Sequence, residues 1–235
     1  MKLNQWFERL IEQITLTHDE VAARRTLEGL SKEAGFRAYA YLNLQAGTQT
    51  VISNYHEDWQ HRYIDKSLAR IDPVVRNARS HFEAFAWSAE TSLKISKERR
   101  HFYSEAAEFG IRSGITVPIR TGFGRIAMFT LASDDTKLPE GLTLNPVLAA
   151  SAVAQLHSRL RCLGAKPTYH TPIRMKPAEL TCLRWSAEGK SMKAIAVIED
   201  MSYANVAFFL RNAKSALGAT SLPQATAMAK EFGLI

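Results

Sequence analysis

The sequence predicts an α/β N-terminal domain, in which an antiparallel sheet is sandwiched by helices, and an all-α C-terminal helix-turn-helix domain. Three observations predict this arrangement. Helix and strand patterns alternate over roughly the first 160 residues, a polar stretch with two prolines and a glycine follows, and the later apolar spacing is purely helical. We therefore expect domains at residues 1–163 and 177–235, joined by a linker at residues 164–176.

Apolar spacing and capping residues predict the helices of the first domain. The chain begins with an amphipathic segment that places Leu3, Trp6 and Leu10 on one helical face. Asp72 followed by Pro73 is typical of a helix start, with Asp as the N-cap and Pro at the first helical position. Further helices are expected over residues 19–34, 58–68, 97–109 and 145–163.

Four strands are predicted as two hairpins. Residues 37–44 and 48–55 are joined by a short turn that contains a glycine, and residues 114–120 and 125–133 flank a second turn with two glycines. Helices before, between and after antiparallel strands imply a sheet with helices on its faces.

Four short helices are predicted for the C-terminal domain. Pro177 begins the first, and Ser191 and Ser202 are the expected N-caps of the next two. Two helices joined by a tight turn, the second longer than the first, form a helix-turn-helix pattern, although a generic four-helix appendage also fits it. The expected ranges are 177–187, 191–198, 203–217 and 222–232.

The composition favours a cytoplasmic protein with a polyanionic partner. The net charge is +7, and a basic excess attracts phosphates, although many basic enzymes share it. No apolar run approaches the roughly 20 residues of a membrane-spanning helix, and charges interrupt the N-terminal segment where a signal peptide would be apolar. Cys162 and Cys182 show no metal-ligand spacing. We expect no membrane partner, no metal and no cofactor.

The C-terminal domain resembles the DNA-binding domain of LuxR-type transcription regulators. The stretch from Trp185 to Ser191, WSAEGKS, is similar to that family's W-x-A-x-G-K-T. Further positions at the family's spacing are Glu179, Leu183, Ile195, Ala196, Ser202 and Val206. The resemblance implies that residues 203–217 form the recognition helix.

The recognition helix departs from the family pattern. Ala207 stands where close relatives have Arg, and Phe209 stands where the family commonly has His. Phe208 either thickens the core or faces outward and alters base recognition, and the sequence leaves both open. From Pro172 to the end, eight basic and five acidic residues give a modest net charge of +3. The residues expected at DNA are Lys190, Lys193, Ser202, Tyr203, Asn205, Ala207, Arg211 and Lys214.

Nearly all of residues 1–165 resemble the ligand-binding domain of the same family, and TraR-type regulators of rhizobial conjugation in particular. The matching runs are residues 54–59, 72–75, 85–87 and 109–116. Positions typical of the family are present as Trp59, Tyr63, Asp72, Pro73, Trp87 and Gly114. The resemblance implies a quorum-sensing regulator that binds an N-acyl-homoserine lactone and dimerises.

The chemistry of such a ligand explains the residue types. A buried polar group left unpaired costs about 1–3 kcal/mol, so each polar atom of the ligand needs a partner. The resemblance implies that Trp59 donates to the lactone carbonyl, Asp72 accepts from the amide N–H and Tyr55 donates to the amide carbonyl. Thr130 matches the position that senses a 3-oxo group through water. The remaining expected lining is Ala40, Leu42, Val51, Tyr63, Ile64, Val74, Val75, Trp87, Tyr103 and Ile111.

Each of these residues also has a structural interpretation. Trp59 and Trp87 could be core residues, Asp72 is a good N-cap without any ligand, and Thr130 is a common strand residue. Their combination at the family's spacing favours the ligand.

Three classes of function follow. The leading one is an activator that dimerises on binding its ligand and binds a palindromic operator in promoter DNA, with RNA polymerase and an antiactivator protein as further candidate partners. The helix at 145–163 is expected to carry the homodimer contact through an apolar stripe that includes Leu156 and Leu160, unless that stripe packs on its own subunit.

A lactone hydrolase is disfavoured, because the sequence contains no HxHxDH-like metal cluster and no G-x-S-x-G motif. The third class is a ligand-responsive relative that pairs with an active paralogue and reads DNA poorly. This third class remains an alternative because the recognition helix departs from the family pattern at Ala207, Phe208 and Phe209.

Overall fold

The computed structural model describes residues 3–45, 48–90, 96–122, 125–138, 144–169, 173 and 175–235. The chain divides into two compact units. The larger one lies within residues 1–171, and the smaller one holds residues 172–235.

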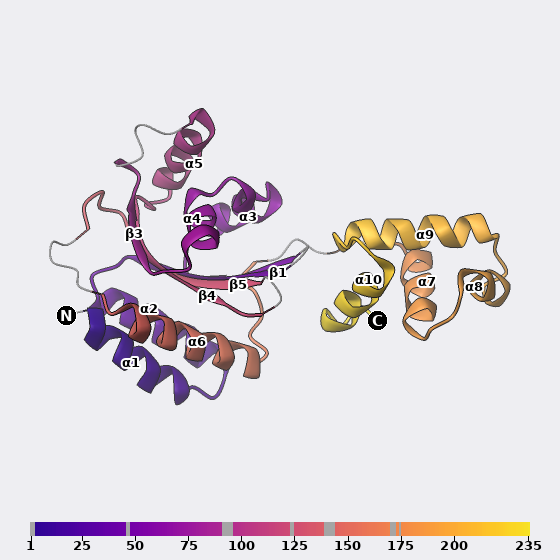
Figure 1. The fold of residues 1–235 in the computed structure, drawn as a ribbon, viewed down its shortest axis with the longest axis horizontal. Helices are drawn as coiled ribbons and strands as arrows, with labels where there is room; N and C mark the ends of the chain where they lie inside the picture. Colours follow the sequence, from indigo (N-terminus) through magenta and orange to yellow (C-terminus); the bar gives the residue numbers. More distant parts are fainter. Residues whose placement is uncertain are drawn as a thin grey trace. The chain divides into compact units, whose positions relative to one another are not determined.

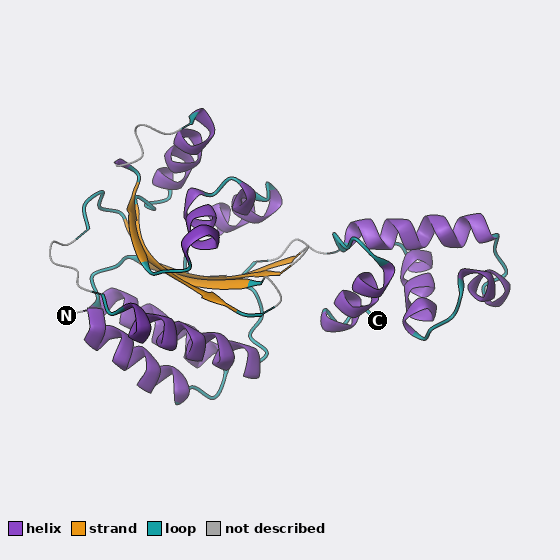
Figure 2. Ribbon diagram, viewed as in Figure 1, coloured by secondary structure: helices purple, strands orange, loops and turns teal. Residues whose placement is uncertain are grey.

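A five-stranded sheet forms the middle of the larger unit (Figure 2). Its order is β2-β1-β5-β4-β3, and β5 pairs antiparallel with both β1 and β4. The four expected strands are present, and β3 is an additional one that sequence patterning missed because four residues carry too little periodicity. The expected turn residues 46–47 and 123–124 lie outside the described residues. The strands are β1 (Ala38–Gln45), β2 (Thr48–Ser53), β3 (Phe85–Ser88), β4 (Ser113–Arg120) and β5 (Ile126–Ser133).

Helices cover both faces of this sheet, which confirms the predicted sandwich (Figure 1). One layer consists of α1 (Leu3–Thr15), α2 (Glu20–Glu33) and α6 (Pro146–Cys162). The other consists of α3 (Glu57–Asp65), α4 (Pro73–His81) and α5 (Lys97–Glu108), with a 3-10 turn at Leu68–Arg70 between α3 and α4.

The central strand β5 is buried on both faces. Phe129 belongs to the core against α1, α2 and α6, where its ring stacks on Trp6 at 5.9 Å between centroids. The indole N–H of Trp6 donates to the carbonyl of Leu30 at 2.7 Å, so this buried tryptophan is paired. Met128 and Thr130 alternate with Phe129 and therefore face the layer of α3, α4 and α5.

The apolar stripe of α6 belongs to the core of its own unit. Ala152 and Leu156 are fully buried and Leu160 is 3% exposed, and all three pack in the cluster that α1 shares. These three side chains therefore pack on their own subunit, which is the alternative interpretation, and a homodimer contact through other residues of α6 stays a prediction. Periodicity identified the apolar face correctly, but α1 covers it.

Part of the expected linker packs on the larger unit. The backbone N–H of Thr168 donates to the carbonyl of Val51 at 2.8 Å. The Tyr169 ring stacks on His61 at 4.0 Å between centroids, and its hydroxyl donates to Asp65 at 3.0 Å. The larger unit therefore extends beyond the expected boundary at residue 163.

The smaller unit is a four-helix domain. Leu183, Ile195, Val206 and Leu210 form its core with other apolar residues. Buried Glu179 joins two helices, because its carboxylate accepts from the side-chain amide of Asn212 at 3.1 Å. The helices are α7 (Pro177–Ala187), α8 (Met192–Ile198), α9 (Tyr203–Ala216) and α10 (Leu222–Glu231).

A tight turn between α8 and α9 completes the helix-turn-helix. Asp200 adopts a left-handed backbone with φ of +47° in this turn. Ser191 caps α8 by accepting from the Ala194 N–H, and Ser202 caps α9 by accepting from the Asn205 N–H. Both predicted N-caps are confirmed.

Candidate functional site

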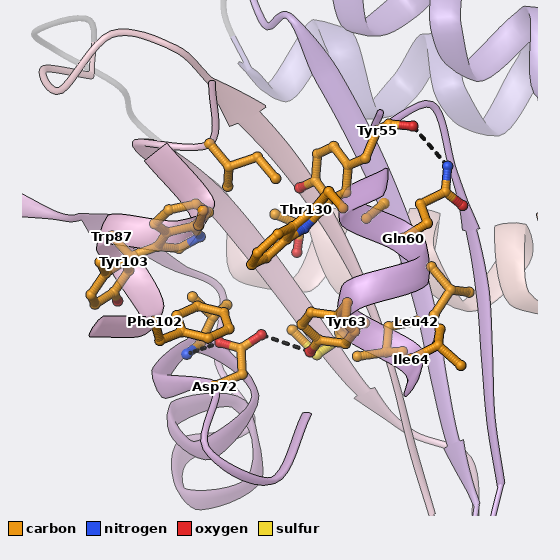
Figure 3. Close-up of a pocket in the computed structure, with 17 residues that line it drawn as sticks. Leu42, Tyr55, Gln60, Tyr63, Ile64, Asp72, Trp87, Phe102, Tyr103 and Thr130 are labelled. Carbon is orange, nitrogen blue, oxygen red and sulfur yellow. Dashed lines mark hydrogen bonds between the residues drawn. The ribbon is translucent and has the colours of Figure 1, made fainter. Parts of the chain in front are cut away.

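A pocket lies between the sheet and the layer of α3, α4 and α5 (Figure 3). Its cavity volume is about 70 Å³. The side chains around it come from both hairpins of the sheet and from all three helices. They are Ala40, Leu42, Val51, Tyr55, Trp59, Gln60, Tyr63, Ile64, Asp72, Val74, Trp87, Phe102, Tyr103, Ala106, Ile111, Met128 and Thr130.

Of the fourteen residues expected at the ligand, thirteen line this pocket, and Val75 is buried in the adjoining apolar cluster instead. Sequence reasoning missed Gln60, Phe102, Ala106 and Met128. Two signals could have found three of them. Met128 alternates with Thr130 on β5, and Phe102 and Ala106 are adjacent to Tyr103 on the inner face of α5.

Gln60 carried no such signal, because its role depends on contacts with distant residues. Its side-chain amide donates to the backbone carbonyl of Tyr55 at 2.7 Å, and its side-chain oxygen accepts from the Thr168 hydroxyl. Gln60 therefore connects the pocket wall to the packed part of the expected linker.

The pocket has an aliphatic end and an aromatic end. Leu42, Ile64 and Met128 belong to an aliphatic cluster, whereas Phe102 and Tyr103 belong to a cluster of mostly aromatic side chains. Figure 3 shows Leu42 and Ile64 together on one side of the pocket and Tyr103 on the other. An elongated ligand with a flat head and an alkyl tail suits this division.

Asp72 supplies a buried acceptor. Its carboxylate accepts from the Tyr63 hydroxyl at 2.7 Å and from the Val74 N–H at 2.8 Å (Figure 3). Burial raises the pKa of Asp72 from 3.8 to about 6, although these hydrogen bonds act in the opposite direction. Asp72 is thus both the N-cap of α4 and part of the pocket wall, so its two sequence interpretations are compatible.

Two donors in the wall are unpaired. Within the described residues, neither the Trp59 indole N–H nor the Tyr55 hydroxyl has a hydrogen-bond partner. Burial raises the pKa of Tyr55 well above its usual value, which keeps its hydroxyl protonated. Both side chains line the pocket, so a ligand that brings acceptors would pair these donors.

A hydrogen-bonded chain leads from Trp87 to Thr130. The Trp87 indole N–H donates to the Thr116 hydroxyl at 3.0 Å, and the hydroxyls of Thr116 and Thr130 lie 2.9 Å apart. Because Thr116 already accepts from Trp87, it can donate its own hydrogen to Thr130. The Thr130 hydroxyl hydrogen is then left for a partner in the pocket.

Gly114 makes room for Trp87. A Cβ at this position would lie 2.6 Å from the Trp87 ring and would also meet the carbonyl of Leu131. Any side chain at residue 114 would therefore displace the tryptophan that begins this chain.

The residues expected at DNA lie on the surface of the smaller unit. Lys190, Lys193, Tyr203 and Arg211 are exposed together with Ser202 and Asn205, whereas Ala207 and Lys214 are half-buried. The Lys214 amine donates to the carbonyl of Thr220 at 3.4 Å.

The two adjacent phenylalanines of α9 face in different directions. Phe209 is half-buried against the core of the smaller unit, whereas Phe208 is 44% exposed. The interpretation in which Phe208 thickens the core is therefore wrong. The Arg211 guanidinium lies over the Phe208 ring, 5.7 Å from its centroid.

The described residues offer neither a metal site nor a membrane-spanning helix. No group of three or more His, Cys, Asp or Glu side chains there is arranged to hold a metal ion. No helix there has the length and apolar character needed to cross a bilayer.

Two protein families match the two parts of the chain. The Autoinducer binding domain family matches residues 19–160. The family described as bacterial regulatory proteins, luxR family, matches residues 177–229. The fold also matches a solved structure of Escherichia coli SdiA, with a TM-score of 0.58 and 19% identity over 100% of this chain and 99% of that one.

Full-length relatives carry both parts. The chain is 41% identical to the transcriptional activator protein TraR of Agrobacterium vitis, over 99% of this chain and 100% of that protein. It is 38% identical to TraR of Rhizobium radiobacter over the same shares. These relatives are transcription regulators and not enzymes. The alternative in which the chain is a lactone hydrolase is therefore rejected. The chain belongs to the luxR family of bacterial regulatory proteins and is a transcription regulator with an N-terminal autoinducer binding domain.

Proposed function

We propose that this protein is a TraR-like activator that binds an N-acyl-homoserine lactone, with a 3-oxo group on its acyl chain, in the pocket of the larger unit. One observation carries the proposal. A buried carboxylate acceptor, Asp72, lines the same pocket as two unpaired donors, Trp59 and Tyr55. This polar set complements one N–H and two carbonyls, which is the set that an acyl-homoserine lactone offers.

The two ends of the pocket orient the ligand. The lactone ring lies at the aromatic end, where the Trp59 indole donates to its carbonyl. The amide N–H donates to Asp72 and the amide carbonyl accepts from Tyr55. The acyl chain then extends to the aliphatic end, among Leu42, Ile64 and Met128.

Thr130 supports the choice of a 3-oxo ligand. Its hydroxyl hydrogen is free to donate when Thr116 donates to it. A 3-oxo group two carbons beyond the amide carbonyl would accept from this hydroxyl, directly or through one water molecule. An unsubstituted acyl chain would leave that donor unpaired.

The smaller unit binds promoter DNA in this proposal. The helix α9 enters the major groove as the second helix of a helix-turn-helix, and a homodimer binds a palindromic operator. Exposed Lys190 and Lys193 contact phosphates. RNA polymerase and an antiactivator protein are further partners that the TraR resemblance suggests.

The surface of α9 favours a second candidate. Ala207 carries no base-contacting group and Arg211 is the only arginine of the helix, so base recognition has few hydrogen-bond donors. A protein of this kind could bind its ligand and pair with an active paralogue without recognising an operator.

One experiment tests the ligand and a second separates the two candidates. The protein is expressed with an equimolar mixture of lactones of several chain lengths, with and without the 3-oxo group, and the retained ligand is identified by mass spectrometry. We expect enrichment of one 3-oxo lactone, whereas retention of none would contradict the ligand. A gel shift on a TraR-type palindrome, with ligand present and a scrambled sequence as control, then distinguishes the activator from the paralogue-binding alternative.

A further inference from the structure

Phe208 lies on the exposed face of α9. Ala204, Phe208, Arg211 and Ser215 are all exposed, and their spacing of four, three and four residues places them on one stripe of the helix. Phe208 is the only large apolar side chain of this stripe. Because Phe209 already packs against the core, the fold does not require an aromatic side chain at residue 208.

The surroundings of Phe208 suit a polyanion. From Met201 to Lys230 the sequence contains no acidic residue, and Arg211 stands one turn from Phe208. Glu199 and Asp200 lie in the preceding turn, and Glu199 is engaged by the Trp185 indole at 2.6 Å. A protein partner that covered Phe208 would also have to accommodate the charge of the exposed Arg211.

The contact between Phe208 and Arg211 brings together a side chain that can hydrogen-bond a guanine and one that can contact the methyl group of a thymine. A guanidinium over an aromatic ring is attracted to it and is held in a limited range of positions. Arginine pairs with the two acceptors on the major-groove edge of guanine. The 5-methyl group of thymine is the apolar feature of that groove, and phenylalanine is one of the side chains that contact it.

We propose that Phe208 is a specificity-determining residue that contacts the 5-methyl group of a thymine in the major groove, next to a base bound by Arg211. This proposal rests on the DNA binding proposed above. Phe208 then replaces part of the selectivity that an arginine at residue 207 would supply.

Deoxyuridine tests this contact, because it differs from thymidine only by the missing 5-methyl group. The full-length, ligand-bound protein first selects its preferred palindrome from random DNA. Each thymine of that palindrome is then replaced by deoxyuridine, singly and in symmetric pairs, and affinities are measured by fluorescence anisotropy. One buried methylene-sized group is worth about 0.8 kcal/mol, which corresponds to about fourfold in affinity for one half-site and about fifteenfold for both.

The variants make the test specific. In F208A the deoxyuridine substitution at that position should have no further effect, because the partner of the methyl group is gone. In F208L part of the effect should remain. V197A is the matched control, since Val197 is an exposed apolar residue of α8 outside the stripe, and it should retain the full effect.

Two outcomes would overturn the proposal and can be told apart. If the wild type binds a selected palindrome but tolerates deoxyuridine at every position, or if F208A keeps the full effect, Phe208 does not contact a thymine methyl and the proposed DNA binding stands. If the ligand-bound wild type selects no sequence, the proposed activator fails as well. Phe208 then belongs to a protein-binding surface.

Discussion

The ligand pocket and the exposed face of α9 place opposite demands on their residues. In the pocket, Asp72, Trp59 and Tyr55 are enclosed, so a polar group without a partner is costly and few residue types are acceptable. On α9, Ala207 is half-buried and Phe208 is exposed, and neither belongs to the core of the smaller unit, so a change there costs the fold little. The chain accordingly keeps the family pattern in the pocket and departs from it on α9.

The largest effect that this comparison predicts is stabilisation of the larger unit by ligand. The pocket wall holds two unpaired donors, and a ligand that binds only the folded form stabilises it by mass action. A lactone at about 1,000 times its Kd should raise the free energy of unfolding by about 4 kcal/mol. Thermal unfolding and trypsin resistance, with and without lactone, measure this. A fatty acid of the same chain length is the control, and equal resistance in all samples would contradict the proposed pocket.

The next effect is the loss of a charged acceptor. We expect Asp72→Asn to weaken lactone binding more than tenfold, because a hydrogen bond to a charged group contributes about 1.5–3 kcal/mol. Asn is also a good N-cap, so α4 should still begin at Pro73 and the protein should fold. Calorimetric titration measures the affinity and circular dichroism checks the fold. A folded variant with unchanged affinity would show that Asp72 acts only as a cap.

Most of this pocket was predicted, and the reasons for the failures are physical. The pair Asp72-Pro73 indicated a helix start from the residues themselves, whereas Ala40, Leu42 and Thr130 were expected at the ligand because of the family resemblance. Such local signals cannot show which element covers an apolar face. Apolar spacing alone therefore left open whether the stripe of α6 faces a second subunit, and only the structure shows that Leu156 and Leu160 pack in the core that α1 shares.

Loss of Arg211 should change the selectivity for DNA sequence by about as much free energy as the loss of the Asp72 charge changes ligand binding. A bidentate pair with guanine discriminates by about 1–3 kcal/mol, and Arg211 is the only arginine of α9. Arg211→Ala should therefore reduce the preference for operator over random DNA, while ligand affinity stays at the wild-type value. Competition gel shifts measure that preference. An unchanged preference would place base recognition elsewhere.

Acid should weaken ligand binding through Asp72. The amide N–H of the ligand requires the charged carboxylate, and burial raises the pKa of Asp72 to about 6. Affinity should therefore fall about tenfold between pH 7 and pH 5, and the affinity of Asp72→Asn should not change over that range. Calorimetric titrations at several pH values test this, and an equal pH dependence in both proteins would assign it to another group.

The same pKa predicts the opposite trend in the stability of the ligand-free protein. Because folding raises the pKa of Asp72 from 3.8, the folded state binds more protons between pH 4 and pH 6. The stability contributed by Asp72 is present below pH 4 and lost as the pH rises through about 6. Relative to Asp72→Asn, the wild type should lose up to about 3 kcal/mol over this interval, measured by urea unfolding.

The smallest effect concerns Lys190, which is exposed at the start of the helix-turn-helix. A phosphate contact contributes to binding on every sequence, so Lys190→Ala should weaken operator and random DNA equally and leave their ratio unchanged. Each lost contact should also make the dependence of log affinity on log salt concentration shallower by about 0.9, counted once per subunit of a dimer. Titrations at several salt concentrations measure this slope. If Lys190→Ala instead changed the operator preference as Arg211→Ala should, the division between phosphate and base contacts in this domain would be wrong.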